Sequence, residues 1–350
     1  MSGVLVTGAA GFIGSFLVKR LIESTSLEII GIDNLNDYYD RQIKLERLEM
    51  LRKADANGRF SFIKGDICDK DTIRDLFECN HFDVVVNLAA QAGVRYSIDN
   101  PQAYVDSNLT GFFNILEACR RFPVRHLVYA SSSSVYGGNK KVPFAETDNV
   151  DSPVSLYAAT KKANELMAHA YSKLYSIPAT GLRFFTVYGP MGRPDMAYFG
   201  FTEKLMNNES IKIFNMGNCK RDFTYIDDIV EGIVRVIGNP PEGRMGEDGL
   251  PMPSHRIYNI GNSNPVDLLE FVDTLQRLLV EEDLLPKEYD FAGHRELVPM
   301  QPGDVAVTYA DTTALRRDTG FTPSTSLQDG LREFVKWYKV YHANKNTGNN

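Results

Sequence analysis

Residues 7 to 14 read Thr7-Gly8-Ala9-Ala10-Gly11-Phe12-Ile13-Gly14, with a glycine at every third position from Gly8. The apolar run Val4-Leu5-Val6 precedes this stretch, and an amphipathic segment of helical length follows it. Glycines at this spacing allow a tight turn from a strand, close approach of a diphosphate to the main chain, and close packing of the helix. We therefore expect Gly8, Gly11 and Gly14 to form a diphosphate site at the N-terminus of the first helix.

Short apolar runs and amphipathic segments alternate through the first half of the chain, which is typical of βαβ units with a parallel sheet. The expected strands cover about residues 4–7, 28–32, 60–64, 84–88, 127–131 and 179–184. The expected helices cover about residues 12–24, 40–54, 69–78, 101–121 and 155–175. The predicted fold class is α/β, with a doubly wound parallel sheet of the Rossmann type.

The alternation weakens after about residue 185, where Gly, Pro and Asn become frequent, as in Gly189-Pro190-Met191-Gly192-Arg193-Pro194. We expect a Rossmann-type cofactor domain over residues 1–185 and a smaller, loop-rich C-terminal substrate lobe over residues 186–342. Later segments, such as residues 256–260, are expected to return to the main sheet. The polar residues 343–350 are expected to form a frayed tail.

The composition is that of a globular protein: 350 residues, of which 43% are hydrophobic and 24% charged. A net charge of -7 argues against a nucleic-acid partner. No run reaches about 18 apolar residues, and the glycine turn follows the first strand too closely for a signal peptide, so no membrane partner is expected. The four cysteines lie far apart and the histidines lack metal-ligand spacing, so we expect reduced cysteines, no metal and a cytoplasmic location.

Asp33 ends the second predicted strand and supports a dinucleotide site. Its carboxylate can accept hydrogen bonds from both hydroxyls of an adenosine ribose and would repel a 2′-phosphate, which favours NAD over NADP. Asp66 follows the third predicted strand in Gly65-Asp66-Ile67. It is expected either to meet the adenine or to be a simple turn aspartate.

Tyr157 and Lys161 lie four residues apart in Tyr157-Ala158-Ala159-Thr160-Lys161 and would share one face of a helix. A nearby positive charge lowers the pKa of a phenol and favours the phenolate. Upstream, Ser131-Ser132-Ser133-Ser134 follows an apolar strand. For Ser131 we expect a buried hydroxyl bonded to the backbone.

Together, the glycine turn, the serine strand and the Tyr-Lys pair resemble the short-chain dehydrogenase/reductase superfamily, in its extended branch that acts on nucleotide sugars. The resemblance runs from Val4 to about Tyr338. Four further stretches are similar to UDP-glucuronate 4-epimerases: Asp33-Asn34-Leu35-Asn36-Asp37-Tyr38-Tyr39, Ala90-Gln91-Ala92-Gly93-Val94-Arg95-Tyr96-Ser97, Gly189-Pro190-Met191-Gly192-Arg193-Pro194-Asp195-Met196-Ala197 and Met300-Gln301-Pro302-Gly303-Asp304-Val305.

This resemblance implies 4-epimerisation of UDP-glucuronate to UDP-galacturonate with NAD as cofactor. The 4-hydroxyl carbon is transiently oxidised, the 4-keto sugar rotates, and the hydride returns to its other face. Tyr157 would be the general base and acid, Lys161 would tune Tyr157 and hold the nicotinamide ribose, and Ser132 would bind the sugar, with Ser133 and Ser134 as alternatives. The implied cofactor-binding residues are Gly8, Gly11, Phe12, Ile13, Gly14, Asp33, Asn34, Asn36, Asp66, Ile67, Leu88, Ala89, Ala90, Tyr157 and Lys161.

The substrate contacts implied by the resemblance lie in the second half of the chain. Arg193 would pair with the sugar carboxylate, since an arginine fork matches a carboxylate in two places. Thr186 would be a second sugar contact, Arg221 a diphosphate ligand and Asp304 an acceptor for the uridine ribose. Gln301 replaces an arginine that many relatives acting on neutral sugars carry, which weakens the inferred diphosphate contact there.

Other functions stay open at this point. The same branch includes 4,6-dehydratases, which would carry Asp-Glu where this chain has Ser133-Ser134. It also includes UDP-galactose 4-epimerases and UDP-glucuronate decarboxylases, and a non-catalytic NAD-binding scaffold would share the fold. A homodimer is expected through residues 101–121 and 155–175, whose apolar side chains include Phe112, Phe113, Leu116, Leu166 and Met167.

Overall fold

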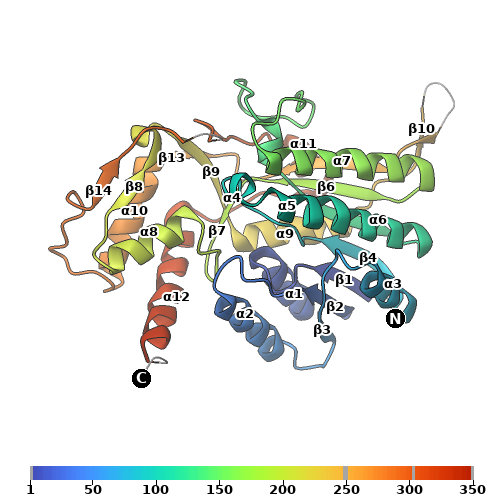
Figure 1. Ribbon diagram of the computed structural model, residues 1–350, viewed down its shortest axis with the longest axis horizontal. Helices are drawn as coiled ribbons and strands as arrows, with labels where there is room; N and C mark the ends of the chain where they lie inside the picture. The colour runs from blue at the N-terminus through green and yellow to red at the C-terminus, as the bar shows by residue number, and fades with distance from the viewer. Residues whose placement is uncertain (1–2, 247–250, 302–303, 348–350) are drawn as a thin grey trace.

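The computed structural model describes residues 3–246, 251–301 and 304–347. Within these residues, one seven-stranded sheet has the strand order β12-β6-β5-β4-β1-β2-β3, and every pair in it is parallel (Figure 1). Its strands are β1 Gly3–Thr7, β2 Glu28–Asp33, β3 Phe60–Lys64, β4 Phe82–Asn87, β5 His126–Ser132, β6 Ala179–Phe184 and β12 His255–Ile260. The predicted α/β class and Rossmann-type sheet are confirmed, and β12 is a late strand that returns to the sheet.

Both faces of this sheet are covered, which explains the continuous apolar runs of its strands. Alternate side chains of β1 enter different cores: Val4 and Val6 pack on one face, and Leu5 packs on the other. All three are buried. Full burial of such a side chain contributes about 1.5–3 kcal/mol to folding.

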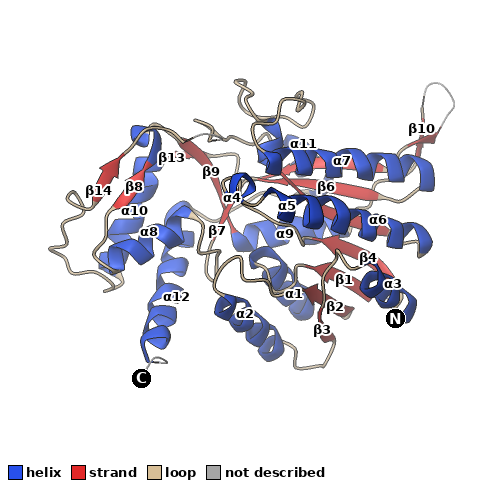
Figure 2. Ribbon diagram, viewed as in Figure 1, coloured by secondary structure: helices blue, strands red, loops and turns tan. Residues whose placement is uncertain are grey.

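Helices lie on both sides of the sheet (Figure 2). The face of Val4 and Val6 carries α1 Phe12–Ser24, α2 Arg41–Ala54 and α9 Ile226–Ile237, and the face of Leu5 carries α3 Lys70–Cys79, α6 Phe112–Arg121 and α7 Leu156–Tyr175. Local polar side chains fix where two of these helices begin. Asp69 accepts a hydrogen bond from the amide of Asp71 at 3.0 Å, and Ser155 accepts one from the amide of Ala158 at 3.1 Å.

The predicted helix over residues 101–121 is confirmed as a continuous helical segment, but it contains a π-helical stretch that was not predicted. The segment is divided into α5 Pro101–Tyr104, a π-helical stretch over Val105–Gly111 and α6, and a short helix, α4 Tyr96–Asp99, precedes it. The physical reason is Asn108, in the middle of the π-helical stretch. Its side chain binds both the main-chain amide and the carbonyl of Gln91, at 2.8 and 3.0 Å, and its own carbonyl accepts a bond from the side-chain amide of Asn164 at 2.6 Å. These tertiary bonds compete with a regular helical ladder.

The second lobe consists of helices and small sheets joined by loops (Figure 1). Its phenylalanine Phe199 packs against Phe334 and Tyr338, so the last helix closes the core of this lobe. The strands of this lobe, and those that link it to the main sheet, are β7 Thr186–Tyr188, β8 Ile211–Ile213, β9 Lys220–Tyr225, β13 Pro265–Asp267 and β14 Arg295–Leu297. Its helices are α8 Ala197–Met206, α10 Leu268–Glu281 and α12 Leu327–Thr347. The remaining elements are β10 Arg244–Met245, β11 Pro251–Met252, α11 Thr313–Thr319 and two 3₁₀ turns, Ser133–Tyr136 and Phe214–Gly217.

Two stretches that the sequence analysis singled out in the C-terminal third lie partly outside the described residues. Helix α12 continues to Thr347, so residues 343–347 are helical where a frayed tail was predicted, and residues 348–350 lie outside the described part. Pro302 and Gly303 of the Gln301-Pro302-Gly303-Asp304 stretch also lie outside it.

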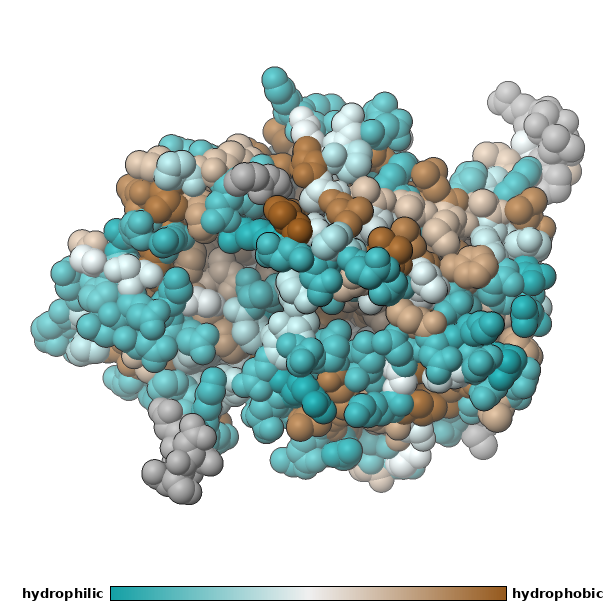
Figure 3. Space-filling model, viewed as in Figure 1, coloured by the Kyte–Doolittle hydropathy of each residue, from teal (hydrophilic) through white to brown (hydrophobic). Residues whose placement is uncertain are grey.

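The apolar surface predicted for a dimer is only partly exposed. Phe112 and Leu116 are buried in the core beneath α6, because the helix turns their face toward the sheet, so their assignment to a surface was wrong. Phe113 and Leu166 are 44% and 58% exposed, and Met167 is partly buried. Figure 3 shows apolar residues gathered over α4, α5, α6 and α7 on the viewed face. No helix among the described residues is long and apolar enough to cross a membrane.

Candidate active site

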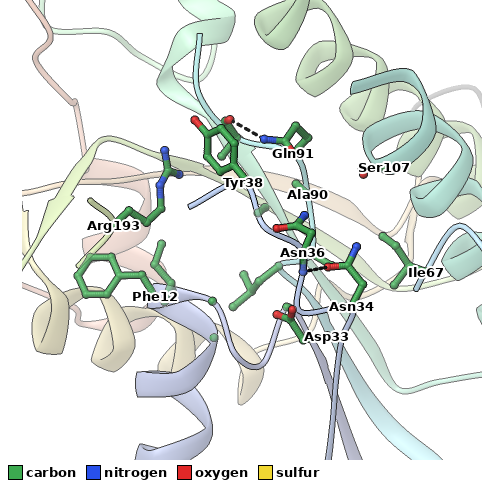
Figure 4. Close-up of a pocket in the computed structure, with 18 of the residues that line it drawn as sticks. Phe12, Asp33, Asn34, Asn36, Tyr38, Ile67, Ala90, Gln91, Ser107 and Arg193 are labelled. Atoms are coloured by element: carbon green, nitrogen blue, oxygen red, sulfur yellow. Dashed lines mark hydrogen bonds between the residues drawn. The ribbon is translucent and has the colours of Figure 1, made fainter. Parts of the chain in front are cut away.

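One cavity lies at the carboxyl ends of β1, β2, β4 and β5, where the strand order of a doubly wound sheet reverses. It brings together all the residues expected to bind the cofactor and all three expected catalytic residues, Ser132, Tyr157 and Lys161. Arg193 reaches the same cavity from the loop after β7. In Figure 4, Arg193 and Tyr38 lie beside each other on one side, and Asp33 and Asn34 lie on another.

The turn after β1 requires its glycines for reasons inside the protein. Gly8 has φ +71°, and its amide donates to the carbonyl of Ile32 at 2.8 Å. A Cβ at Gly11 would lie 2.9 Å from the carbonyl oxygen of Gly8, and one at Gly14 would lie 2.1 Å from the same oxygen. Any side chain at Gly14 would therefore push the turn away from helix α1. Gly11, expected to admit a diphosphate, is also needed for the turn itself.

The first turn of α1 is suited to an anion. Gly11 occupies its N-cap position, makes no side-chain cap, and no acidic residue lies in the first turn. The residues Gly11 to Gly14 line the cavity, so the positive end of the helix dipole faces it. A cradle of glycines with uncapped helix amides fits the diphosphate of a dinucleotide.

Asp33 is fixed by the same turn. Its carboxylate accepts hydrogen bonds from the amides of Ala10 at 3.2 Å and Leu35 at 2.9 Å. The side-chain amide of Asn34 donates to Asp66 at 2.9 Å, and Asp66 also accepts from the amide of Cys68 at 2.8 Å. Burial opposes ionisation of Asp66, but these hydrogen bonds lower the pKa of its carboxyl. Asp66 is thus both a turn aspartate and part of the cavity wall.

Lysine and arginine side chains from α2 support this end of the cavity. The ammonium of Lys44 donates to the main-chain and side-chain oxygens of Asn36, at 2.9 and 2.7 Å, and its burial lowers its pKa. The fully buried Arg47 donates to the carbonyls of Ala10 at 3.0 Å and Met191 at 2.6 Å. Arg47 therefore ties the glycine turn to the loop that carries Arg193.

The catalytic face of α7 meets the end of β5. Lys161 is buried, its ammonium donates to the carbonyl of Ala130 at 2.9 Å, and burial lowers its pKa to about 8. Burial raises the pKa of the Tyr157 phenol, while a hydrogen bond with Ser132 and the charge of Arg193 lower it. Arg193 thus adds a positive charge near Tyr157 that the sequence did not predict.

The four serines after β5 have separate positions. Ser131 donates to the Glu165 carboxylate at 2.6 Å, so the expected backbone partner was wrong. That carboxylate also pairs with the buried Arg183 at 2.8 Å, which anchors α7 behind the cavity. The hydroxyl of Ser132 accepts a bond from the amide of Ser134 at 3.1 Å. Ser133 and Ser134 begin a 3₁₀ turn and do not line the cavity.

The expected substrate residues form two groups. Arg193 lies in the cavity, and it forms an ion pair with Asp195. Thr186, Arg221 and Asp304 are not part of the cavity wall. Arg221 donates to the carbonyl of Ala306 at 3.1 Å, which places it beside the segment of Asp304. Asp304 itself contacts Arg95 at 3.2 Å. Thr186, Arg221 and Asp304 therefore lie in the lobe that begins at residue 186, and Asp304 lies where this lobe meets the Rossmann-type domain.

Several cavity residues had no expected role. The side chains are those of Tyr38, Tyr39, Lys44, Gln91, Ser107, Phe184, Phe185, Val187 and Met196. Tyr38, Tyr39 and Gln91 lie inside the stretches that carried the resemblance, so closer attention to those stretches would have found them. Ser107 and Lys44 lie on helical segments without any motif, and only the fold brings them to the cavity. No cluster of potential metal ligands is present in the described part of the chain.

Comparison with known proteins gives a consistent result. The model of the "NAD dependent epimerase/dehydratase family" matches residues 4–261. A probable UDP-glucuronate 4-epimerase of Rhizobium meliloti (strain 1021) is 43% identical over 350 residues, which are 98% of this chain and 98% of that protein. UDP-glucuronate 4-epimerase 4 of Arabidopsis thaliana is 46% identical, over 97% of this chain and 76% of that protein.

A solved structure adds a three-dimensional match. The UDP-glucuronic acid 4-epimerase of Bacillus cereus, crystallised with UDP-glucuronic acid and NAD, is similar to this chain with a TM-score of 0.82 and 31% identity. The match covers 97% of this chain and 99% of that one.

Proposed function

The chain belongs to the NAD dependent epimerase/dehydratase family, and from this premise we propose that it is a UDP-glucuronate 4-epimerase that uses NAD. The observation that carries the proposal is the shared cavity. A glycine turn suited to a diphosphate, the side chains of Ser132 and Tyr157, and Arg193 all line it. The product is UDP-galacturonate.

NAD fits the residues at the β1 and β2 ends of the cavity. Gly11 to Gly14 would hold its diphosphate, and Asp33, already oriented by two amides, would accept from the adenosine ribose. Asn34, Asn36, Asp66 and Ile67 would complete the adenosine side, and Leu88, Ala89 and Ala90 would line the path toward Tyr157. When bound, NAD supplies a hydride acceptor and donor for C4 of the sugar.

The chain's own residues move the proton. Tyr157 would take the proton of the 4-hydroxyl as a phenolate and give it back to the new alkoxide. Ser132 would hold that oxygen through its hydroxyl, and Arg193 would favour the phenolate by its charge. Lys161, held on the carbonyl of Ala130, would bind the nicotinamide ribose and add to the positive field.

Selectivity for an acidic sugar would come from Arg193. Its Nε and Nη2 donate to Asp195, so the Nη1 edge is left for a sugar carboxylate. We further propose that the lobe from residue 186 binds the uridine diphosphate, with Arg221 on the diphosphate and Asp304 on the ribose. Thr186, on β7 beside β9, would meet the sugar.

We also propose a cytoplasmic homodimer. Phe113 and Leu166 are exposed apolar side chains of α6 and α7, which pack side by side, and Leu174 is 69% exposed on the same helix as Leu166. Such a self-complementary helical surface favours a twofold interface. The four free cysteines agree with a reducing compartment.

Incubation of the protein with UDP-glucuronate, followed by chromatographic separation of the products, tests the function. UDP-galacturonate is expected. Release of UDP-pentose and carbon dioxide would identify a decarboxylase, and conversion of UDP-glucose but not UDP-glucuronate would identify a neutral-sugar epimerase. Absence of turnover with any UDP-sugar, in protein that binds NAD, would leave only a binding protein and refute the proposal.

A further inference from the structure

Asp195 shares the guanidinium that the sugar carboxylate would use. Arg193 has five N–H donors, and its Nε and Nη2 donate to Asp195 at 2.9 and 2.6 Å. The hydroxyl of Tyr38 donates to the same carboxylate at 3.1 Å. Among the described residues, Nη1 of Arg193 makes no hydrogen bond. The arginine is thus held by one edge and open at the other.

An anion at the open edge would share one positive charge with Asp195. The groups around this charge are mostly phenols, namely Tyr38, Tyr104, Tyr157 and Tyr198, with Arg47 as a second cation. Burial disfavours ionisation of Asp195, but the ion pair with Arg193 more than compensates and lowers the pKa of its carboxyl. Asp195 is therefore charged at neutral pH, and two carboxylates on one guanidinium each bind less tightly than one alone.

Epimerisation requires that the sugar carboxylate can leave the guanidinium of Arg193. The sugar must present first one face of C4 and then the other to the same point, so its C5 carboxylate has to change position between the two half-reactions. A lone, desolvated arginine would hold the carboxylate in its first position. A partner already bound to the arginine makes release easier, because the guanidinium keeps its counter-ion when the sugar leaves.

We propose that Asp195 is a positioning residue that competes with the sugar carboxylate for Arg193; this inference rests on the proposed function. The competition would allow the keto sugar to rotate between the two half-reactions. Tyr38 moderates this competition, because its hydroxyl takes up part of the negative charge of Asp195. The ion pair between Arg193 and Asp195 then sets how tightly an acidic sugar is held while it rotates, and does not serve only to stabilise the fold.

Asp195→Asn tests this proposal, because asparagine keeps the shape and one acceptor but removes the competing charge. For UDP-glucuronate, KM should fall about fivefold, and kcat should fall by a similar factor because the sugar is released more slowly. For UDP-glucose, which has no carboxylate, KM should not fall. Calorimetric titration of the variant with UDP-glucuronate should show the same tightening.

Asp273→Asn is the matched control. Asp273 lies on α10, away from the cavity, and its substitution removes one charge from an ion pair with Arg295 of β14, so both kinetic constants should stay unchanged. If Asp195→Asn does not fold, Tyr38→Phe tests the same competition by strengthening the hold of Asp195 on Arg193 instead of removing it. Without the phenol, Asp195 binds Arg193 more strongly, so KM for UDP-glucuronate alone should rise about twofold.

The outcomes separate this proposal from the function on which it rests. Absence of epimerisation by the unchanged protein would refute the function. If the unchanged protein epimerises UDP-glucuronate, a higher KM of Asp195→Asn for both sugars would show a structural role and overturn the proposal. A lower KM with unchanged kcat would overturn it as well, because tighter binding would then not hinder the turning of the sugar.

Discussion

Arg193→Ala is the substitution that separates acidic from neutral sugars most clearly. Two donors on Nη1 and the second donor on Nη2 are left over from the Asp195 pair, which is enough for a two-point contact with a carboxylate. Loss of a hydrogen bond to a charged group costs about 1.5–3 kcal/mol. The kcat/KM for UDP-glucuronate should therefore fall roughly tenfold to 150-fold.

In Arg193→Ala, the unpaired Asp195 lowers kcat/KM for UDP-glucuronate further. Without its partner, the carboxylate of Asp195 faces the sugar carboxylate directly, and like charges repel. Arg193→Ala combined with Asp195→Asn should therefore recover part of the activity lost in the single variant. Arg193→Lys, which keeps the charge but not the planar fork, should lie between the unchanged protein and Arg193→Ala.

The assay compares both sugars and all products. Turnover of UDP-glucose should change little in Arg193→Ala. Once its carboxylate is freed from Arg193, the keto sugar can change its ring pucker so that the C5–C6 bond stands perpendicular to the plane of the 4-keto group and overlaps with the carbonyl π system, so the variant should release some UDP-pentose and carbon dioxide. Equal losses on UDP-glucuronate and UDP-glucose would refute the pairing and make Arg193 a structural or phosphate-binding residue.

Four further predictions follow from the same geometry. Gly14→Ala should abolish retention of NAD and lower the melting temperature, because its Cβ would lie 2.1 Å from the carbonyl oxygen of Gly8; cofactor content after denaturation and a thermal melt measure both. Tyr157→Phe should lose turnover by several orders of magnitude while NAD content stays normal, and near-normal turnover would mean that another base acts. Lys161→Met should raise the free energy of unfolding at pH 7 by about 3 kcal/mol, because the lysine pKa is near 10.5 in the unfolded chain and about 8 in the folded chain, and each pKa unit corresponds to about 1.4 kcal/mol. The free energy of unfolding of the unchanged protein should accordingly rise as the pH increases from about 8 to about 10.5. Denaturant titrations at pH 7 and about pH 10 would show a smaller difference in this free energy between the two proteins at the higher pH. Leu166→Glu should convert a dimer to a monomer in sedimentation experiments at micromolar concentration, and an unchanged mass would place the interface elsewhere.

Local sequence patterns were sufficient to predict which residues at the β1 and β2 ends line the cavity. A buried strand, a glycine turn and an acid at the end of the next strand are each encoded within a few residues, because the turn from β1 into α1 needs Gly8 and Gly14 for its own main-chain contacts. The spacing of Tyr157 and Lys161 likewise needs only a helix to place them together. These features depend little on the rest of the fold.

Features that depend on distant contacts were not predictable in this way. The π-helical stretch arises from bonds between Asn108 and residues of two other segments, and a periodicity argument over residues 101–121 does not include them. The same holds for Arg47, a buried cation without a motif that joins the glycine turn to Met191.

The second lobe shows the same limit. Its helices α8 and α12 pack through aromatic rings that are far apart in sequence, such as Phe199 and Phe334, and the frequent glycines and prolines there do not indicate these contacts. Arg193 was expected to be free for a ligand, and only the structure shows that Asp195 already holds one of its edges.

The most direct test of the central claim is the reaction of UDP-glucuronate in deuterated water, followed by proton NMR of the purified nucleotide sugar. If C4 is oxidised and reduced on the same enzyme-bound cofactor, the hydrogen that leaves C4 returns to it without mixing with solvent, and the bond between C5 and its hydrogen is never broken. We therefore expect UDP-galacturonate with hydrogen, not deuterium, at both C4 and C5. Deuterium at C5 of a pentose or of a dehydrated product, or deuterium at C4 of the galacturonate, would contradict the assignment of this chain as a UDP-glucuronate 4-epimerase.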